Sequence, residues 1–304
     1  MWAITSYFNP VRYKRRLSNY RVFRSNLSVP LVAIELSFDG HFELTRDDAD
    51  ILIQISGGAV LWQKERLLNL ALKAVPRDVE NVGWLDCDVV LKRKDWVDEA
   101  EKKLKNLNVI QLFSDAIFVD AEEIQNLPDH RNGHTYVPGI VGLSDAGDRL
   151  AVGSNVMPKK VTYSTGFAWA ANREILEGHG FYDAGIVGSG DSLMAAAIYG
   201  RYDAVIKRYL LSATRERHYL RWAIPFHESV AKRIGSVSGT VCHLRHGEIQ
   251  NRGYVDRHVW FADFDFDPDA DLKIGENGAW QWARPRLDLE TRLREYFLSR
   301  DEDT

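Results

Sequence analysis

Two aspartates one residue apart, Asp86 and Asp88, follow the apolar run "VGWL" at 82–85. In an extended chain, residues two apart point the same way, so the two carboxylates share one face and Cys87 points to the other. Two unpaired carboxylates this close repel each other, and a divalent cation that carries phosphate oxygens would relieve that repulsion. The same pattern also occurs by chance where a strand runs out into a polar loop. The pair therefore indicates a metal site only together with further ligands.

Two histidines, His243 and His246, lie three residues apart in "TVCHLRHGEIQNRGYVDR" at 240–257. This spacing suits ligation of one metal ion from a turn or short helix. Carboxylate, imidazole and phosphate ligands together favour Mn²⁺ or Mg²⁺ over a closed structural zinc site. The alternative is that either histidine is a surface or capping residue. Arg252, nearby in the same segment, suits a bidentate contact with phosphate.

A third segment, "VGSGDSLMAAAIYG" at 187–200, places Asp191 after a Gly-rich turn and at the start of a predicted helix. Aspartate is common as a helix N-cap, which is one interpretation of this residue. The other interpretation is a carboxylate that faces an acceptor hydroxyl as general base or orienting group. The segment alone leaves both interpretations open.

The elements that must position these residues alternate along the first two-thirds of the chain. Strand-like runs lie at 2–8, 29–38, 51–55, 81–91 and 108–113, and helix-like runs lie at 62–75 and 94–107, the latter with Asp95 as N-cap. This rhythm predicts a layered α/β sheet with parallel character, which usually binds ligands at the carboxyl ends of its strands.

The remainder of the chain is less regular. Residues 129–160 are rich in Gly, Pro, Asn and Asp and are predicted to form a long, irregular loop region. A strand that runs into a helix is expected at 161–176, and a final helix at 286–298. Because no repeat or linker is evident, we expect one domain over 1–304, with 262–304 as a C-terminal extension.

The composition is that of a soluble globular protein, with 45% hydrophobic and 27% charged residues. A formal net charge of −4 argues against a general polyanion binder, although six basic residues and no acid occupy positions 12–24. Two cysteines, Cys87 and Cys242, form no disulfide framework and fit a reducing compartment. No apolar run reaches the roughly 18 residues of a membrane span, so a cytoplasmic location is expected.

These segments, in this order, resemble the metal-dependent glycosyltransferases of the GT-A fold, particularly the β-1,4-galactosyltransferase-like group. "QKERLLNLALKAV" followed by "VGWLDCDVVL" looks like the basic helix and D-x-D strand of that group. "YSTGFAWA", which contains Gly166, is similar to the segment beside the donor sugar. "GHGFYDAGIVGSGDSLM" resembles the segment that meets the acceptor, and "CHLRHGEIQNRGYVDR" the metal-ligand turn. The likeness covers most of residues 1–260 in pieces.

The resemblance implies a GT-A (Rossmann-like) nucleotide-sugar binding fold, with a mixed, mostly parallel central sheet flanked by helices. It implies a nucleoside-diphosphate-sugar donor, a UDP-sugar first, and Mn²⁺ or Mg²⁺ acting as Lewis acid on the diphosphate. Asp191 would be the catalytic base. The implied metal ligands are Asp86, Asp88, His243 and His246, and the implied donor-binding residues are Lys64, Arg66, Asn69, Asp86, Gly166 and Arg252.

The chain departs from the family pattern where adjacent acids are expected, because Ser192 follows Asp191. Inversion is nevertheless favoured over retention. The acceptor is expected to be a hydroxyl on a glycan. One alternative is a hydroxylated base in DNA, which the basic residues of 12–24 would support and which would need base flipping; the net charge and the acidic stretch 301–303 weigh against it. The other is a nucleotide-sugar- or carbohydrate-binding module without turnover, which the missing second acid would explain.

Overall fold

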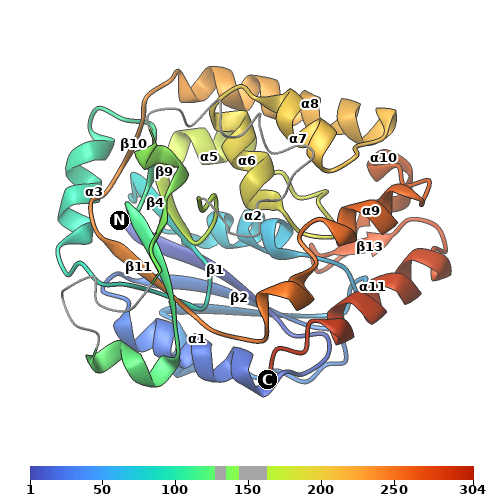
Figure 1. The fold of residues 1–304 in the computed structure, drawn as a ribbon, viewed down its shortest axis with the longest axis horizontal. Helices are drawn as coiled ribbons and strands as arrows, with labels where there is room; N and C mark the ends of the chain where they lie inside the picture. The colour runs from blue at the N-terminus through green and yellow to red at the C-terminus, as the bar shows by residue number, and fades with distance from the viewer. Residues whose placement is uncertain (127–134, 144–162) are drawn as a thin grey trace.

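A seven-stranded sheet forms the middle of the molecule in the computed structural model, which describes residues 1–126, 135–143 and 163–304 (Figure 1). Its strand order is β10-β6-β9-β4-β1-β2-β3. The strands are β1 (Trp2–Phe8), β2 (Leu31–Ser37), β3 (Ile51–Ser56), β4 (Asn81–Leu85), β6 (Val109–Gln111), β9 (Ala168–Asn172) and β10 (Ile234–Ser236). Strand β9 runs antiparallel to both neighbours and every other pairing is parallel.

Apolar side chains leave both faces of this sheet and enter two separate cores. In β1, Ile4 and Phe8 enter the larger core, whereas Ala3 and Tyr7 enter the smaller one. Both cores are covered by helices, because a parallel sheet must be buried on its two faces. The predicted fold class is confirmed: α/β, with a mixed, mostly parallel central sheet flanked by helices.

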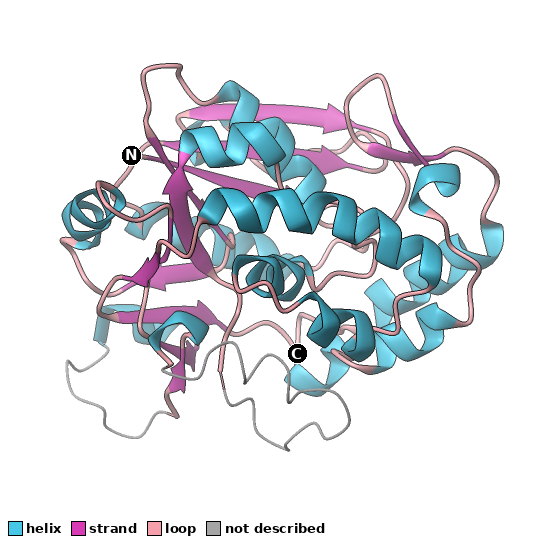
Figure 2. Ribbon diagram, turned by 90° about the horizontal axis from the view of Figure 1, so that it is seen from above, coloured by secondary structure: helices cyan, strands magenta, loops and turns pink. Residues whose placement is uncertain are grey.

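The helices divide between the two faces (Figures 1 and 2). Helices α1 (Lys14–Asn26) and α3 (Trp96–Leu104) pack on the smaller core. Those that contribute buried residues to the larger core are α2 (Lys64–Ala74), α5 (Arg173–His179), α6 (Gly190–Ile198), α7 (Tyr202–Arg208), α8 (Ala213–Val230), α9 (Asp256–Ala262) and α11 (Leu287–Ser299). In the described ranges, no helix combines the length and hydrophobicity needed to cross a bilayer.

A second sheet, of four strands, begins directly after the turn that holds Asp86 and Asp88. It has the order β5-β11-β7-β8, with β5 (Val89–Leu91), β11 (Thr240–Leu244), β7 (Asp115–Val119) and β8 (Val137–Pro138). The single strand predicted at 81–91 is therefore wrong. The chain leaves the central sheet after Leu85, turns through residues 86–88 and enters the second sheet at Val89. Asp86 and Asp88 lie in the turn between two sheets.

Other predicted elements agree with the structure to different degrees. The helix expected at 62–75 is α2, and the final helix is α11. Asp95 occupies the N-cap position of α3, but its carboxylate pairs with Arg93 and caps no backbone N–H. Most of 129–160 lies outside the described residues; the described part, 135–143, contains β8 and the single 3₁₀ turn Ile140–Gly142.

Helices α1, α7 and α8 have no counterpart among the predicted elements. Helix α1 is the basic stretch itself, and it packs on the sheet through Tyr20 and Phe23. Helix α8 contains Pro225, a residue that normally ends a helix, so local pattern argues against the helix that tertiary packing stabilises.

The segment 262–304 packs on the rest of the chain along its length. It contains α10 (Pro268–Asp271), a hairpin of β12 (Leu272–Ile274) and β13 (Trp280–Trp282), and α11. Phe297 of α11 belongs to the same core as the buried face of α2. The chain then returns beside α1, where Figure 1 shows its end.

Candidate active site

Backbone hydrogen bonds fix the turn that carries the two aspartates. The N–H of Asp86 donates to the carbonyl of Phe167 over 2.8 Å, just before β9. The carbonyl of Asp88 accepts from the N–H of Leu244 over 2.8 Å, at the end of β11. The first aspartate is thus tied to the central sheet and the second to the strand that carries His243.

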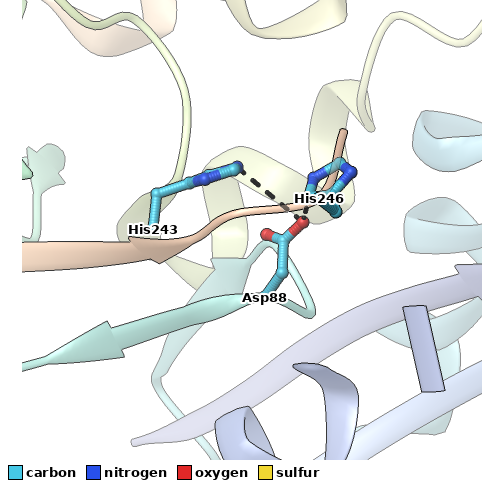
Figure 3. Close-up of side chains that lie close together, drawn as sticks. All are labelled: Asp88, His243 and His246. Atoms are coloured by element: carbon cyan, nitrogen blue, oxygen red, sulfur yellow. Dashed lines mark ion pairs between the residues drawn. The ribbon is translucent and has the colours of Figure 1, made fainter. Parts of the chain in front are cut away.

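Asp88, His243 and His246 form a cluster whose ligand atoms all lie within 4.8 Å of one another (Figure 3). His246 Nε2 lies 2.9 Å from Asp88 Oδ2, and His243 Nε2 lies 3.8 Å from the same oxygen. His243 belongs to strand β11 and His246 to the turn that follows. The three-residue spacing therefore brings the two histidines together across the end of a strand, and the short helix expected as one alternative is absent there.

Burial and charge set the protonation states in this cluster. The His243 ring is 2% exposed and lies 5.2 Å from the ring of Phe118 and 4.9 Å from that of Phe167, and its burial lowers the pKa of His243 to about 3. Burial alone would raise the pKa of Asp88, but His243 and His246 lower it below its ordinary value. An ionised carboxylate and a neutral imidazole are the forms that bind a metal ion.

Some buried polar atoms of the cluster have no hydrogen-bond partner among the described residues. Asp88 Oδ1 and His243 Nδ1 are buried and accept or donate no hydrogen bond within the described part of the chain. Buried polar groups are normally hydrogen-bonded, so orphaned atoms at a cluster of ligands indicate a missing partner. One carboxylate and two imidazoles fit a divalent transition ion and leave coordination positions open for other oxygens.

Asp86 lies in a different cluster. Its Oδ1 is 2.5 Å from Lys64 Nζ, and the same Nζ lies 2.9 and 3.0 Å from the two carboxylate oxygens of Asp191. Burial opposes the charge of Lys64, but Asp191 and Asp86 raise the pKa of its ammonium well above the ordinary value. The structure thus pairs Asp86 with a cation of the protein itself, at the N-terminus of α2.

Asp191 lies in the first turn of α6, whose N-cap is Ser189, so the N-cap interpretation of Asp191 is wrong. Its carboxylate packs against Gly166: a Cβ at that glycine would lie 3.1 Å from Asp191 Oδ2. The predicted donor residue Gly166 and the predicted base therefore lie side by side.

Glu65 is a buried acid that the sequence did not single out. It is 6% exposed, and burial raises its pKa to about 8. Gly190 makes room for it, because a Cβ there would lie 1.9 Å from Glu65 Oε1. A glutamate in the first turn of a helix is normally a solvated acid that interacts favourably with the helix dipole, so no local signal marks Glu65 as buried.

Arg66 and Asn69 bind the segment around Asp183. Arg66 Nη1 and Asn69 Nδ2 lie 3.2 and 3.0 Å from Asp183 Oδ2. The guanidinium of Arg66 also lies 5.2 Å from the ring centroid of Trp280, whose indole N–H donates to the Asp183 carbonyl. These contacts link α2 to β13, and the predicted role of both residues in donor binding stays a prediction.

Arg252, by contrast, lies at the metal-ligand cluster. It is 7% exposed, and its Nη2 lies 3.0 Å from His246 Nε2. A buried guanidinium beside a metal-ligand cluster is suited to bind an anion there.

Comparison with known proteins finds distant structural likeness alone. No protein-family model and no curated protein matches the chain. The catalytic domain of Drosophila β1,4-galactosyltransferase 7 in complex with xylobiose is 10% identical, with 96% of this chain and 98% of that one covered and a TM-score of 0.37. A mutant of that enzyme, in complex with manganese, UDP-Gal and xylobiose, gives a TM-score of 0.38. Staphylococcus aureus TarS is 13% identical over 75% of this chain and 70% of its own, with a TM-score of 0.36.

Proposed function

We propose that this protein is a glycosyltransferase that moves a hexose from a nucleoside-diphosphate sugar to a hydroxyl on a glycan. A UDP-sugar is the favoured donor. The observation that carries the proposal is the Asp88–His243–His246 cluster, in which the turn after β4 supplies Asp88 and the end of β11 supplies two buried histidines. That turn lies at the carboxyl edge of the mostly parallel sheet, where open α/β sheets bind ligands.

The proposed metal centre holds Mn²⁺ or Mg²⁺ on Asp88, His243 and His246. A divalent ion there would act as Lewis acid on the diphosphate leaving group. Asp86 is left out of this set, since its carboxylate pairs with Lys64. Arg252 is proposed to bind a phosphate oxygen, because its guanidinium is buried beside the cluster.

Asp191 is the proposed general base. Lys64 donates to both of its carboxylate oxygens and so fixes its orientation beside Gly166. A base that takes the proton of an acceptor hydroxyl supports direct attack on the anomeric carbon. Direct displacement inverts that carbon, so inversion is proposed over retention.

Several of the basic residues that would support a DNA acceptor are engaged within the protein. Arg12 pairs with Asp39, Arg24 with Asp50, and the partly buried Arg16 with Glu302 over 3.1 Å. These pairs leave less positive charge for phosphates, which favours a glycan acceptor.

A cytoplasmic location is proposed as well. Both cysteines are free thiols, which suits the reducing environment of the cytoplasm.

The test is a panel of UDP-, GDP- and dTDP-sugars, screened with Mn²⁺ by thermal shift and then by hydrolysis and transfer to glycans. Ligand binding to the native state raises the melting temperature by mass action. We expect one sugar nucleotide to stabilise the protein with Mn²⁺ and to be turned over, and we expect EDTA to abolish both effects. Binding without turnover would instead indicate a binding module, and transfer to duplex DNA the other alternative.

A further inference from the structure

The segment Arg300–Asp303 lies at the N-terminus of α1 and places an acid beside the Asp88–His243–His246 cluster. The Glu302 side chain is 1% exposed. Its Oε1 accepts from the Nε of Arg300 over 2.5 Å, its Oε2 lies 3.1 Å from Nη1 of Arg16, and the same Oε2 lies 3.4 Å from Nδ1 of His246. A carboxylate 286 positions along the chain from Arg16 is therefore buried where α1, the segment and the cluster meet.

The segment is held in this place by contacts that do not involve Glu302. Asp303 accepts from the backbone N–H groups of Lys14 and Arg15 over 3.1 and 2.8 Å, at the start of α1. The N–H of Asp301 donates to the hydroxyl of Tyr13 over 2.9 Å. A Cβ at Gly247, next to His246, would lie 2.6 Å from the carbonyl oxygen of Asp301. The segment thus packs directly on the backbone beside a metal ligand.

The two ring nitrogens of His246 face different acids. Nε2 lies 2.9 Å from Asp88, on the metal side, and Nδ1 faces Glu302 on the other. An imidazole that binds a metal through Nε2 carries its proton on Nδ1, and a carboxylate there fixes both the tautomer and the ring. The 3.4 Å separation is longer than a good N–H···O hydrogen bond and lacks its geometry, so the contact has to tighten when the proton is held on Nδ1.

We propose that Glu302 is a positioning residue for the metal ligand His246, an inference that rests on the metal centre of the proposed function. The ring of His243 lies against those of Phe118 and Phe167, and its Nδ1 has no hydrogen-bond partner in the described chain. His246 follows the strand, and its ring is held instead between Asp88, Arg252 and Glu302. Metal affinity is therefore coupled to the docking of residues 300–303 against α1.

The competing explanation is that Glu302 only neutralises its neighbours, the partly buried Arg16 and the buried Arg300. Glu302→Asp separates the two roles, because it keeps the charge for the arginines and withdraws the carboxylate from Nδ1 by one methylene. Asp303→Asn is the matched control: it alters the neighbouring acid of the same segment, which contacts α1 and not His246.

The experiment measures Mn²⁺ affinity of the wild type, Glu302→Asp, Glu302→Gln and Asp303→Asn by EPR titration. We expect both Glu302 variants to raise the Kd for Mn²⁺ by about 10-fold or more, as loss of an outer-shell partner does, and the control to leave it nearly unchanged. Long-range ¹H–¹⁵N NMR of the wild type with Zn²⁺ as a diamagnetic probe should show His246 coordinated through Nε2 with a proton on Nδ1.

Each other outcome overturns the inference. Mn²⁺ binding by the wild type with an unchanged Kd in both folded Glu302 variants would overturn it and leave the metal centre intact. Coordination of Zn²⁺ through Nδ1 of His246 would also overturn the inference. This result needs only the wild type, so it holds even if the variants do not fold. No Mn²⁺ binding by the wild type would overturn the metal centre itself and this inference with it.

Discussion

The two aspartates on either side of Cys87 have opposite surroundings. Asp86 faces the ammonium of Lys64, which also holds Asp191, whereas Asp88 faces two imidazoles and keeps one oxygen without a partner in the described chain. The same D-x-D motif thus contains one carboxylate that pairs with a lysine of the protein and one that does not. The cation proposed above therefore lies beside Asp88 and not beside Asp86.

The difference follows from the two sheets that meet at this turn. Asp86 directly follows β4 of the central sheet, where α2 covers one face and places Lys64 beside it. Asp88 precedes β5 of the second sheet, which pairs with β11 so that Val89 lies opposite His243. The proposed metal centre thus lies on the Asp88 side of the turn, and the proposed base Asp191 lies on the Lys64 side.

The largest effect is expected for turnover when the base is removed. Asp191→Asn should lower kcat by about 100-fold or more, since a positioned general base contributes on that order. The Kd for the donor with Mn²⁺ should stay nearly the same, because Asp191 contacts Lys64 rather than the metal ligands. Steady-state kinetics and calorimetric binding measure the two quantities. A kcat for the variant equal to that of the wild type would mean that Asp191 has only a structural role.

A smaller effect, on stability, is expected when the internal cation is removed. Lys64→Met leaves Asp86 and Asp191 close together without their shared partner, and their side chains are only 23% and 28% exposed. The free energy of unfolding in urea should fall by about 2 kcal/mol, below the value for a fully buried pair because both acids are partly solvated.

The control for that change is Lys73→Met, an exposed lysine in the last turn of the same helix. It should alter the free energy of unfolding by no more than about 0.5 kcal/mol. Similar losses in the two variants would mean that the Lys64 cluster contributes no more than a surface charge.

The last prediction concerns the pH dependence of the free energy of unfolding, through the buried Glu65 beside this cluster. Burial raises its pKa to about 8, against about 4.3 in an unfolded chain. A carboxyl whose pKa is raised by folding stabilises the fold below the unfolded value, and that contribution is lost as pH rises towards 8. Glu65→Gln should therefore raise the free energy of unfolding more near pH 9 than near pH 5. An equal difference at both pH values would contradict the shift.

Local pattern predicted the layered α/β fold because the buried strands are apolar on both faces and the amphipathic α2 carries the expected helix formers. It failed for α8, where Pro225 signals a break that packing overrides. It also joined β4 and β5 into one strand, since nothing in the residues 86–88 marks a change of sheet.

The candidate site shows the same limit. Residue types and spacing made Asp88, His243 and His246 candidates, and only the family resemblance assigned them, with Asp86, to one metal ion. The structure brings the first three together. The partner of Asp86 could not be predicted, because Lys64 lies 22 positions away in the sequence and only the packing of α2 on the sheet brings them together. Glu302 is farther still, and its acidic neighbours in the sequence are typical of a solvated surface.

The central claim is that the metal binds on the Asp88 side of the turn alone. Its most direct test is the Kd for Mn²⁺ of the wild type, Asp88→Asn and Asp86→Asn, measured by isothermal titration calorimetry. Asp88→Asn should weaken binding by more than about 100-fold, the upper end of the loss seen for outer-shell partners, while Asp86→Asn should leave it nearly unchanged. Equal losses in the two variants, or no binding of Mn²⁺ by the wild type, would contradict the claim.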